Sequence, residues 1–562
     1  MKFRFSITSW AQIITSSLAI ILFSISAKAI VDMKNANYSN TWTDFHLDGT
    51  GYDLKLERTY NSRTLFNGIF GFGWCTNFET KLDVTSESNL KIKECGAGSE
   101  LVFSQREISR QDVEKTVDFI ISKMKAEKVA GRNDEFYKKK KEEFLESDDL
   151  RAYEAKKYGM TSKLVDGSKF LANGKEVDSI IFKSSYYERT LPDGSKQRFN
   201  AQGQLTHMYD KNGNMLKLEY DKVGLLKEVA DTNARKLTFK YYPNKKVHQI
   251  LGPNSLKAEY QYQNVDDLSY SIDSKKYATK YKYDDLHNLT DITFTDGSKV
   301  NIKYDQNNDW VIGFVDRDKC SETYGYEVDK KDPKGHFWST VKKVCGKETV
   351  AQSKYEFWHK QKANGEYVLS RVLSIENDKE VDISYHETFG RPISIRKNGE
   401  KMTYEYTSDG LVKSKTTNNV KLSFEYGAAI KKPTKVSIEN FNEKGKKVNS
   451  RFTKFQYDTK GNLNYAENSD GQKIELSYDN KGRITQIVDQ AKKVVKLQYE
   501  EKYNKPVIVA RPGLGSIKVA YKPNGDISKV DSKEGPSVAM QVASTFNNLL
   551  DIIAPATQEL FL

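Results

Sequence analysis

One repeat unit of this chain reads GQKIELSYDNKGRITQIVD, residues 471–489. Apolar and polar residues alternate up to Tyr478 and Asp479, and a glycine follows at Gly482. Alternation with a period of two is typical of a strand that buries one face, and glycine supplies the positive φ that a tight hairpin turn requires. The unit is therefore predicted to be a β-hairpin.

The same pattern recurs along most of the chain, with about 21 residues between its aromatic positions. A tandem array of such hairpins forms one antiparallel sheet. That sheet must curl into a tube or shell, or cover its apolar face with another element. A β-propeller is the alternative, but its blades of about 40 to 45 residues fit this spacing only in pairs. The repeat-defining tyrosines followed directly by aspartate are Tyr220, Tyr283, Tyr304, Tyr457 and Tyr478.

The composition agrees with a β fold. The 562 residues include 33 Tyr, 27 Phe and 34 Gly but only 8 Met and 11 Pro, which favours pleated surfaces and tight turns over helix bundles. Charged residues make up 29% and the formal net charge is +13, yet both signs are interspersed and the apolar fraction is 38%. A chain of this kind is expected to fold rather than to remain disordered.

Two further motifs precede the repeats: GYDLKLERTYNSR at residues 51–63 and GIFGFGW at residues 68–74. Together with the Tyr-Asp repeats, they resemble the Rhs/YD-repeat family, whose tandem hairpins wind into hollow β-shells. The resemblance covers residues 160–531 and implies a complete or partial shell. Large members end their repeats with an Asp-Pro-x-Gly-Leu core-closing motif and a toxin domain, and we expect neither here. The sequence DPKG at residues 332–335 lacks the leucine and lies in mid-array, so it is predicted to be an ordinary turn.

We therefore predict a mainly β protein, in which tandem hairpin repeats form a curled antiparallel sheet or partial hollow shell, with a helical insertion and a C-terminal helix. The expected divisions are a signal peptide at residues 1–29, an N-terminal Rhs-associated β region at 30–106, a charged helical insertion at 107–158, the repeats at 159–531 and an amphipathic helix at 532–562.

Both predicted helical stretches have an apolar face. In the insertion, this face has helical spacing. Lysines 138–141 there could bind an anion, but the acidic residues that follow favour a solvated helical face. The face of the C-terminal helix is wide and must dock, either as a plug in the open shell or against a partner. The insertion's face consists of Val113, Val117, Ile120 and Met124, and that of the C-terminal helix of Val538, Val542, Phe546, Leu549, Leu550 and Ile553.

The N-terminus indicates export. Lys2 and Arg4 precede an apolar run over residues 13–26 that is too short for a good membrane span, and AKA at residues 27–29 fits a small-x-small cleavage site. The mature chain is then expected to begin at Ile30 and to have no transmembrane span. It would lie in the periplasm, at the cell surface or outside the cell. An uncleaved N-terminal anchor is the alternative.

Four cysteines follow the predicted signal peptide: Cys75, Cys95, Cys320 and Cys345. An even number in an exported chain favours disulfides, and three pairings are possible. Proximity in the sequence favours Cys75 with Cys95 and Cys320 with Cys345. A zinc site of four thiolates is the alternative, although the C-x-x-C spacing typical of such sites is missing.

No catalytic, cofactor or metal site is expected. The histidines fall in no metal-binding motif, and the sequence has neither a G-x-S-x-G elbow nor a phosphate-binding loop. Turns of the Asp-x-Asn-Gly type resemble calcium loops but lack the closing glutamate, so hairpin turns explain them. Exposed tryptophans could stack on sugars, although core positions are commoner. The histidines are His46, His207, His248, His287, His336, His359 and His386, and the tryptophans after the signal are Trp42, Trp74, Trp310, Trp338 and Trp358.

These observations favour an exported, non-enzymatic scaffold that binds, encloses or presents a protein partner at the bacterial cell envelope or in cell-contact processes. A carbohydrate-binding or envelope-polymer-binding protein is the first alternative, encouraged by the basic charge and the aromatic residues. A remnant or accessory of an Rhs toxin-delivery system is the second. Nucleic acid is not expected as a partner, because the chain is exported and has no recognition motif.

Overall fold

The computed structural model describes most of the chain. The predicted signal peptide, Ile30, Cys95 and most of the C-terminal stretch lie outside the described residues. The described residues are 31–94, 99–106, 109–160, 164–172, 175–362, 366–428, 431–501, 504–522, 527–532, 540, 544, 545 and 552.

One antiparallel sheet of 36 strands dominates the fold. It starts with β7 (Lys81–Val84), β8 (Leu90–Glu94) and β9 (Ser99–Ser104), and β9 pairs with β10 (Lys169–Ala172). From β10 to β42 (Ile527–Ser532), neighbours in the sheet are also neighbours in the chain, as tandem hairpins require. The sheet is not closed, and the prediction of a mainly β array of hairpins is confirmed.

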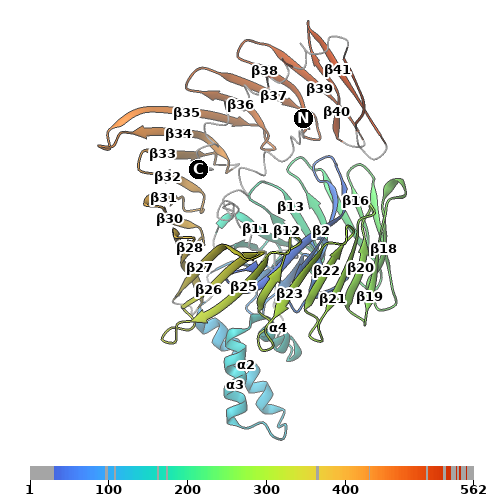
Figure 1. The fold of residues 1–562 in the computed structure, drawn as a ribbon, viewed down its shortest axis with the longest axis vertical. Helices are drawn as coiled ribbons and strands as arrows, with labels where there is room; N and C mark the ends of the chain where they lie inside the picture. Colours follow the sequence, from blue (N-terminus) through green and yellow to red (C-terminus); the bar gives the residue numbers. More distant parts are fainter. Residues whose placement is uncertain are drawn as a thin grey trace.

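The sheet curls into two lobes, which lie in the lower and upper parts of Figure 1. We call residues 31–376 the first lobe, the strands within residues 379–416 the linking strands, and residues 420–532 the second lobe. The first lobe continues the sheet with β11 (Lys175–Lys183), β12 (Tyr186–Thr190), β13 (Lys196–Asn200), β14 (Leu205–Tyr209), β15 (Met215–Tyr220), β16 (Leu226–Asp231), β17 (Lys236–Tyr241), β18 (Val247–Leu251), β19 (Lys257–Gln263), β20 (Asp267–Ile272), β21 (Ala278–Tyr283), β22 (Leu289–Phe294), β23 (Lys299–Tyr304), β24 (Val311–Val315), β25 (Ser321–Val328), β26 (His336–Cys345), β27 (Glu348–Gln361) and β28 (Tyr367–Glu376).

The linking strands lead from the first lobe into the second. They are β29 (Lys379–Tyr385), β30 (Pro392–Lys397), β31 (Glu400–Tyr406) and β32 (Val412–Thr416). The second lobe consists of β33 (Val420–Tyr426), β34 (Pro433–Phe441), β35 (Lys447–Tyr457), β36 (Leu463–Asn468), β37 (Lys473–Tyr478), β38 (Ile484–Asp489), β39 (Val494–Glu500), β40 (Lys505–Arg511), β41 (Gly515–Tyr521) and β42.

A separate N-terminal sheet lies inside the first lobe. It has the strand order β1–β2–β3–β6, and a small ribbon of β4 and β5 accompanies it. The long sheet begins with β7 to β9, which fall within the stretch predicted as an N-terminal region at residues 30–106. The bounds are β1 (Val31–Asp32), β2 (Asn37–Leu47), β3 (Leu54–Asn61), β4 (Asn67–Gly68), β5 (Gly71–Phe72) and β6 (Trp74–Thr76), with short 3₁₀ turns at Asn77–Glu79 and Pro253–Ser255.

Three helices form a module of their own between β9 and β10. They are α2 (Arg110–Ala126), α3 (Asp134–Glu146) and α4 (Asp148–Lys157), and they project from the first lobe in Figure 1. The apolar stripe of α2 packs against Phe144 and Ala155, which gives the module a small core of its own. Among the described helices, none is long and apolar enough to cross a membrane.

The phased tyrosines connect each repeat to the one before it. Each hydroxyl in this set donates to a backbone carbonyl near the start of an earlier strand, at 2.5 to 3.1 Å. The Tyr304 hydroxyl, for example, donates to the carbonyl of Leu289 at 3.0 Å. In most of these strands the register shifts by one residue at the tyrosine, which is the mark of a bulge. A bulge bends its strand, so its repetition curls the sheet.

The aspartate after the tyrosine closes the turn that follows. The Asp479 carboxylate accepts hydrogen bonds from the backbone N–H groups of Lys481 and Arg483, and Gly482 supplies a φ of 79°. Asp221, Asp284 and Asp458 do the same in their turns. An aspartate suits this place because its side chain can satisfy the N–H groups of its own turn. The DPKG sequence at residues 332–335 also lies in a turn, between β25 and β26.

The register of β23 generates the first prediction. Val300 and Ile302 are buried, Tyr304 packs half-buried against the same core, and Lys303 is exposed on the other face. Tyr304→Asp should lower the free energy of unfolding by about 3 kcal/mol or more, because it places an unpaired charge against apolar side chains. Tyr478→Asp should act in the same way on β37.

The control is Lys303→Asp, next to Tyr304 but on the exposed face, which should change stability by about 0.5 kcal/mol or less. Urea unfolding followed by circular dichroism measures all three variants. Equal losses for Tyr304→Asp and Lys303→Asp would contradict the register.

Candidate functional site: the inner face of the curled sheet

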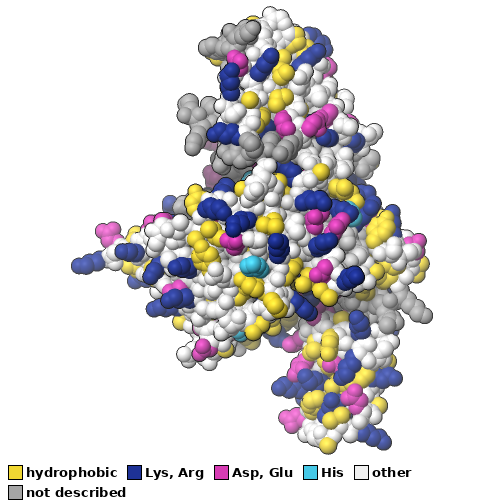
Figure 2. All heavy atoms as spheres, turned by 90° about the vertical axis from the view of Figure 1, so that its right-hand side faces the viewer, with side chains coloured by type: hydrophobic (Ala, Val, Ile, Leu, Met, Phe, Trp, Pro, Cys, Tyr) yellow, Lys and Arg dark blue, Asp and Glu magenta, His cyan; other side chains and the backbone are white. Residues whose placement is uncertain are grey.

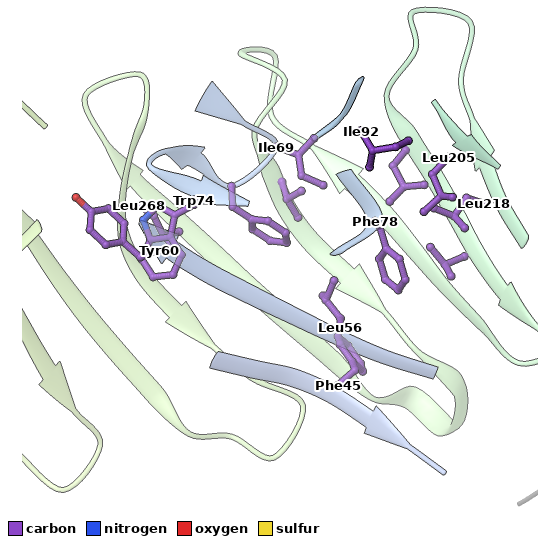
Figure 3. Packing of buried hydrophobic residues seen from close by; sticks show 14 of the residues in the cluster. Phe45, Leu56, Tyr60, Ile69, Trp74, Phe78, Ile92, Leu205, Leu218 and Leu268 are labelled. Carbon is purple, nitrogen blue, oxygen red and sulfur yellow. The ribbon is translucent and has the colours of Figure 1, made fainter. Parts of the chain in front are cut away.

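The inner face of the first lobe is filled by the chain itself. Figure 3 shows Phe45, Leu56 and Tyr60 of the N-terminal sheet with Trp74 and Phe78, packed against side chains of the curled sheet such as Leu218 and Leu268. All of these side chains belong to one buried hydrophobic cluster. The described part of the first lobe is therefore a packed core rather than an open chamber.

A buried ion pair fixes the N-terminal sheet to the long sheet. Arg58 on β3 donates to both carboxylate oxygens of Asp44 on β2, at 2.5 and 3.0 Å. The long sheet holds both partners, because the Tyr260 hydroxyl donates to Asp44 at 2.7 Å and Arg58 donates to the Ser271 hydroxyl at 3.1 Å. Two charges this deeply buried are tolerated because they pair and bond to neighbours.

Aromatic rings surround the Arg58 guanidinium. Its central carbon lies 5.1 to 5.6 Å from the ring centroids of Phe70, Trp74 and Tyr260. Burial disfavours the charge, but Asp44 together with Tyr281 and Tyr260 outweighs that effect and raises the pKa of Arg58 further above its usual range. The guanidinium therefore stays charged and contributes both an ion pair and cation–π contacts to the core.

The second lobe has an inner apolar face of its own. Its buried cluster contains one residue from outside the sheet, Ile552, which is 0% exposed. The Thr453 hydroxyl donates to the Ile552 carbonyl at 3.3 Å, and Thr545 is also buried. The sheet residues of this cluster are Leu422, Val436, Ile438, Phe455, Ala466, Ile474, Leu476, Ile487, Val495 and Leu497.

Two of the tryptophans lie on the outer face of the sheet. Phe337 and Phe357 belong to the inner cluster, so the alternate residues His336, Trp338 and Trp358 face outward. His336 stacks on Trp358 with ring centroids 4.7 Å apart. Lys354 lies over Trp338, and Arg371 lies 4.6 Å from the Trp358 ring centroid. Trp42 and Trp74 pack in the core of the first lobe, and the Trp310 ring packs against Tyr326.

The charges are spread over the surface rather than gathered. On the face shown in Figure 2, basic and acidic side chains are interspersed, on the helical module as well as on the sheet. In the lysine run at 138–141, Lys140 pairs with Glu143 and Lys141 with Asp118. This pattern fits the solvated helical face expected for the run.

Two family models match the sequence. One is described as a domain of unknown function (DUF6531) and matches residues 29–103, and the other is described as Teneurin YD-shell and matches residues 346–511. The chain is an Rhs/YD-repeat protein. The Tyr-Asp turns, the hairpin array and the upstream motifs at residues 51–74 are the parts of the sequence that indicated this family, and the fold is a scaffold of the YD-shell type.

Solved structures with partial similarity are Tc toxin complexes. TcdB2-TccC3 without its hypervariable C-terminal region is 11% identical over 92% of this chain, with a TM-score of 0.34. The pore of the Photorhabdus luminescens Tc holotoxin is 9% identical over 88% of this chain, with a TM-score of 0.36. This YD-repeat chain covers 31% and 29% of those two chains. No curated protein matches the sequence.

The cysteines of this YD-repeat protein divide into two sets. A disulfide joins Cys320, just before β25, to Cys345 at the end of β26. Cys75 is buried on β6, whereas Cys95 lies outside the described residues, so the pairing proposed for these two remains a prediction.

Among the described residues, His46 lies in a group of metal-ligand type with Asp48 and Asp53. The group is exposed, and its members already have partners: His46 contacts Asp53 at 3.0 Å, and Lys505 pairs with Asp48. Sequence spacing gave no sign of this group because the three residues match no metal motif. The other histidines lie apart from this group, on strands of the long sheet or, for His287 and His386, in turns between its strands.

The buried pair generates the second prediction. Asp44→Asn should lower the free energy of unfolding by about 3 to 5 kcal/mol, because it leaves the buried Arg58 charge without its partner. The matched control is Asp296→Asn, which breaks the exposed ion pair with Arg317 and should cost about 1 kcal/mol or less. Equilibrium urea unfolding measures both variants. A loss at Asp44 no larger than that at Asp296 would contradict the anchoring role.

Proposed function

We propose that this YD-repeat protein is an exported, non-enzymatic scaffold that encloses polypeptide on the inner face of its sheet. The first lobe encloses the N-terminal sheet, and the second lobe encloses the chain's own C-terminal stretch, residues 533–562. The single observation that supports the second occupant is Ile552, which is fully buried in the apolar cluster of the second lobe. A basic N-terminus, an apolar run and a small-x-small site support export.

The chemistry of the C-terminal stretch fits that face. Thr545 and Ile552 are both buried, and they are seven positions apart, which is the spacing of residues on one face of a helix. Met540 belongs to the same stretch and is 71% exposed. A buried Thr545 and Ile552 together with an exposed Met540 is the pattern expected for an amphipathic helix in an apolar groove.

The third prediction uses the full chain. Ile552→Asp should release the C-terminal stretch, because the new carboxylate would be buried without a partner. Met540→Asp is the matched control, since the same change at an exposed position should leave the stretch in place. Limited proteolysis followed by mass spectrometry measures the rate of cleavage after residue 532 in both variants. We expect this rate to be about tenfold higher in Ile552→Asp than in Met540→Asp.

Equal cleavage in the two variants would contradict enclosure of the stretch. Deletion of residues 536–562 separates this role from a partner contact. Enclosure predicts a destabilised, aggregation-prone protein, because the apolar face of the second lobe is uncovered. A stable protein that no longer retains a companion from its native compartment would instead assign the stretch to a partner.

Carbohydrate binding is a second candidate function, favoured by Trp338 and Trp358. These rings lie on the outer face on either side of His336. Lys354 and Arg371, which also pair with Glu356 and Asp382, lie over them. Sugar rings stack on aromatic side chains, and basic groups beside them would favour acidic sugars. The ligand class of this second proposal is an acidic envelope polysaccharide, whose acid groups would compete with Glu356 and Asp382 for Lys354 and Arg371.

The fourth prediction tests that surface. Trp358→Ala should weaken retention of the protein in affinity gels that contain an acidic polysaccharide, by about tenfold in dissociation constant, and added salt should weaken the wild type further. Trp310→Ala is the control, because this ring packs against Tyr326 instead. Unchanged retention in Trp358→Ala would exclude this surface as a glycan site.

A further inference from the structure

The two lobes have separate hydrophobic cores. The cluster of the first lobe extends along the chain to Phe357, and that of the second lobe begins at Leu422. Between them run the linking strands, where Ile383 and Val412 are buried but belong to neither cluster. The lobes are thus continuous in the hydrogen-bonded sheet but not in apolar packing.

The second lobe returns to touch the first through hairpin turns. The turn at residues 210–214 of the first lobe meets the turns at 458–462 and 479–483 of the second. Asn212 and Asn462 exchange hydrogen bonds between their side-chain amides, at 2.8 and 3.3 Å. We call this contact the seam.

Other polar groups complete the seam. The Asn214 amide donates to the carbonyl of Lys481 at 2.9 Å. A second point of contact joins Asn504 to the Gly49 carbonyl at 3.0 Å and Lys505 to Asp48. In the described residues, the hydrogen bonds and ion pairs of the seam come from turns and strand ends, where Asn214 and Asn462 are buried and Asp48 is exposed. Each contact contributes little net stability, because the same groups bond to water when the seam opens.

Closure of the seam also brings two ammonium groups together. Lys211 of the first lobe and Lys432 of the second both donate to the Gly461 carbonyl, at 2.8 and 2.7 Å. Burial, followed by the charge of Lys211, lowers the pKa of Lys432 to about 8. The carboxylates of Asp193, Asp210 and Asp458 face the pair and partly offset this cost. The closed seam therefore holds a like-charge pair that separation of the lobes would relieve.

We propose that the second lobe is hinged at the linking strands and opens away from the first lobe at the seam. Opening would expose the inner face of the second lobe to solvent without disturbing either core. Its use for loading or releasing a polypeptide rests on the proposed function, whereas the movement itself does not.

The fifth prediction compares two pairs of asparagines. Asn212→Ala with Asn462→Ala removes the amide contact across the seam. Asn440→Ala with Asn449→Ala removes a single, exposed side-chain amide bond between β34 and β35, within the second lobe. The seam variant should show a larger maximum dimension in small-angle X-ray scattering than the wild type. Its amide hydrogen exchange at residues 210–214 and 458–462 should be about tenfold faster.

The control pair should leave both measurements unchanged, and circular dichroism should be the same in all three proteins. Scattering and seam exchange in the seam variant that match those of the control would overturn the hinge. These readouts require no occupant, so their failure is distinguishable from a failure of the enclosure test at Ile552.

A second pair of variants tests the seam by adding a methyl group that clashes with Asn212 or meets open space. A Cβ at Gly482 would lie 2.1 Å from the Asn212 side-chain nitrogen, whereas a Cβ at Gly471 would meet nothing within 4 Å. The two glycines have nearly the same positive φ, 79° and 78°, so an alanine meets similar backbone strain at each. Gly482→Ala should open the seam in scattering and exchange, and Gly471→Ala should not. The same response in both would overturn the proposal.

A cross-link tests the movement in the opposite direction. Asn212→Cys with Asn462→Cys should be joined by a short bis-thiol-reactive cross-linker, because the native side chains touch at their amide ends and this spacing exceeds the reach of a disulfide. Exchange of the seam amides should then be about tenfold slower than before cross-linking. Exchange that stays the same after cross-linking would show that the lobes do not part.

Discussion

The curl of the sheet depends on one contact that recurs from repeat to repeat. A tyrosine hydroxyl donates to a backbone carbonyl of an earlier strand, beside a one-residue bulge, as Tyr478 does to Leu463 and Tyr304 to Leu289. A bulge strengthens the local bend of a strand, and bulges at the same phase of successive hairpins add their bends in one direction. The following aspartate closes the turn. Curvature is therefore encoded locally, in the Tyr-Asp pair of each unit.

A curled sheet with an apolar concave face needs something to cover that face. In the first lobe the cover is the N-terminal sheet, and the Arg58–Asp44 pair bonds to Tyr260 and Ser271 on the surrounding strands. Such a buried pair adds specificity of position, because a shifted N-terminal sheet would leave two charges unpaired. In the second lobe the described cover is Ile552, which is a smaller contact.

The sequence predicted what the repeat determines and missed what distant segments determine. Alternation and glycine turns indicated the hairpins, and the resemblance to Rhs/YD repeats indicated the shell; the mainly β, repeated fold is confirmed. The repeat pattern allowed for another element on the apolar face but did not identify it, because no local pattern shows that Asp44 and Arg58 meet Tyr260, about 200 residues later. The seam was not predicted from the sequence for the same reason. Asn212 and Asn462 are ordinary turn residues until the curl brings them together.

Chain order makes the two lobes different in kind. In a repeat array each hairpin contacts mainly its neighbours, so it gains little from strands far away unless another segment connects them. If hairpins add in the order of synthesis, the N-terminal sheet is present before β15 to β25 wrap around it, and each new hairpin of the first lobe meets an apolar surface at once. The second lobe has no such template. Its strands are synthesised before Ile552, so its inner face forms uncovered and is covered last. A separate core lets this lobe fold without the first lobe, and a polar seam lets the two lobes meet after each has formed.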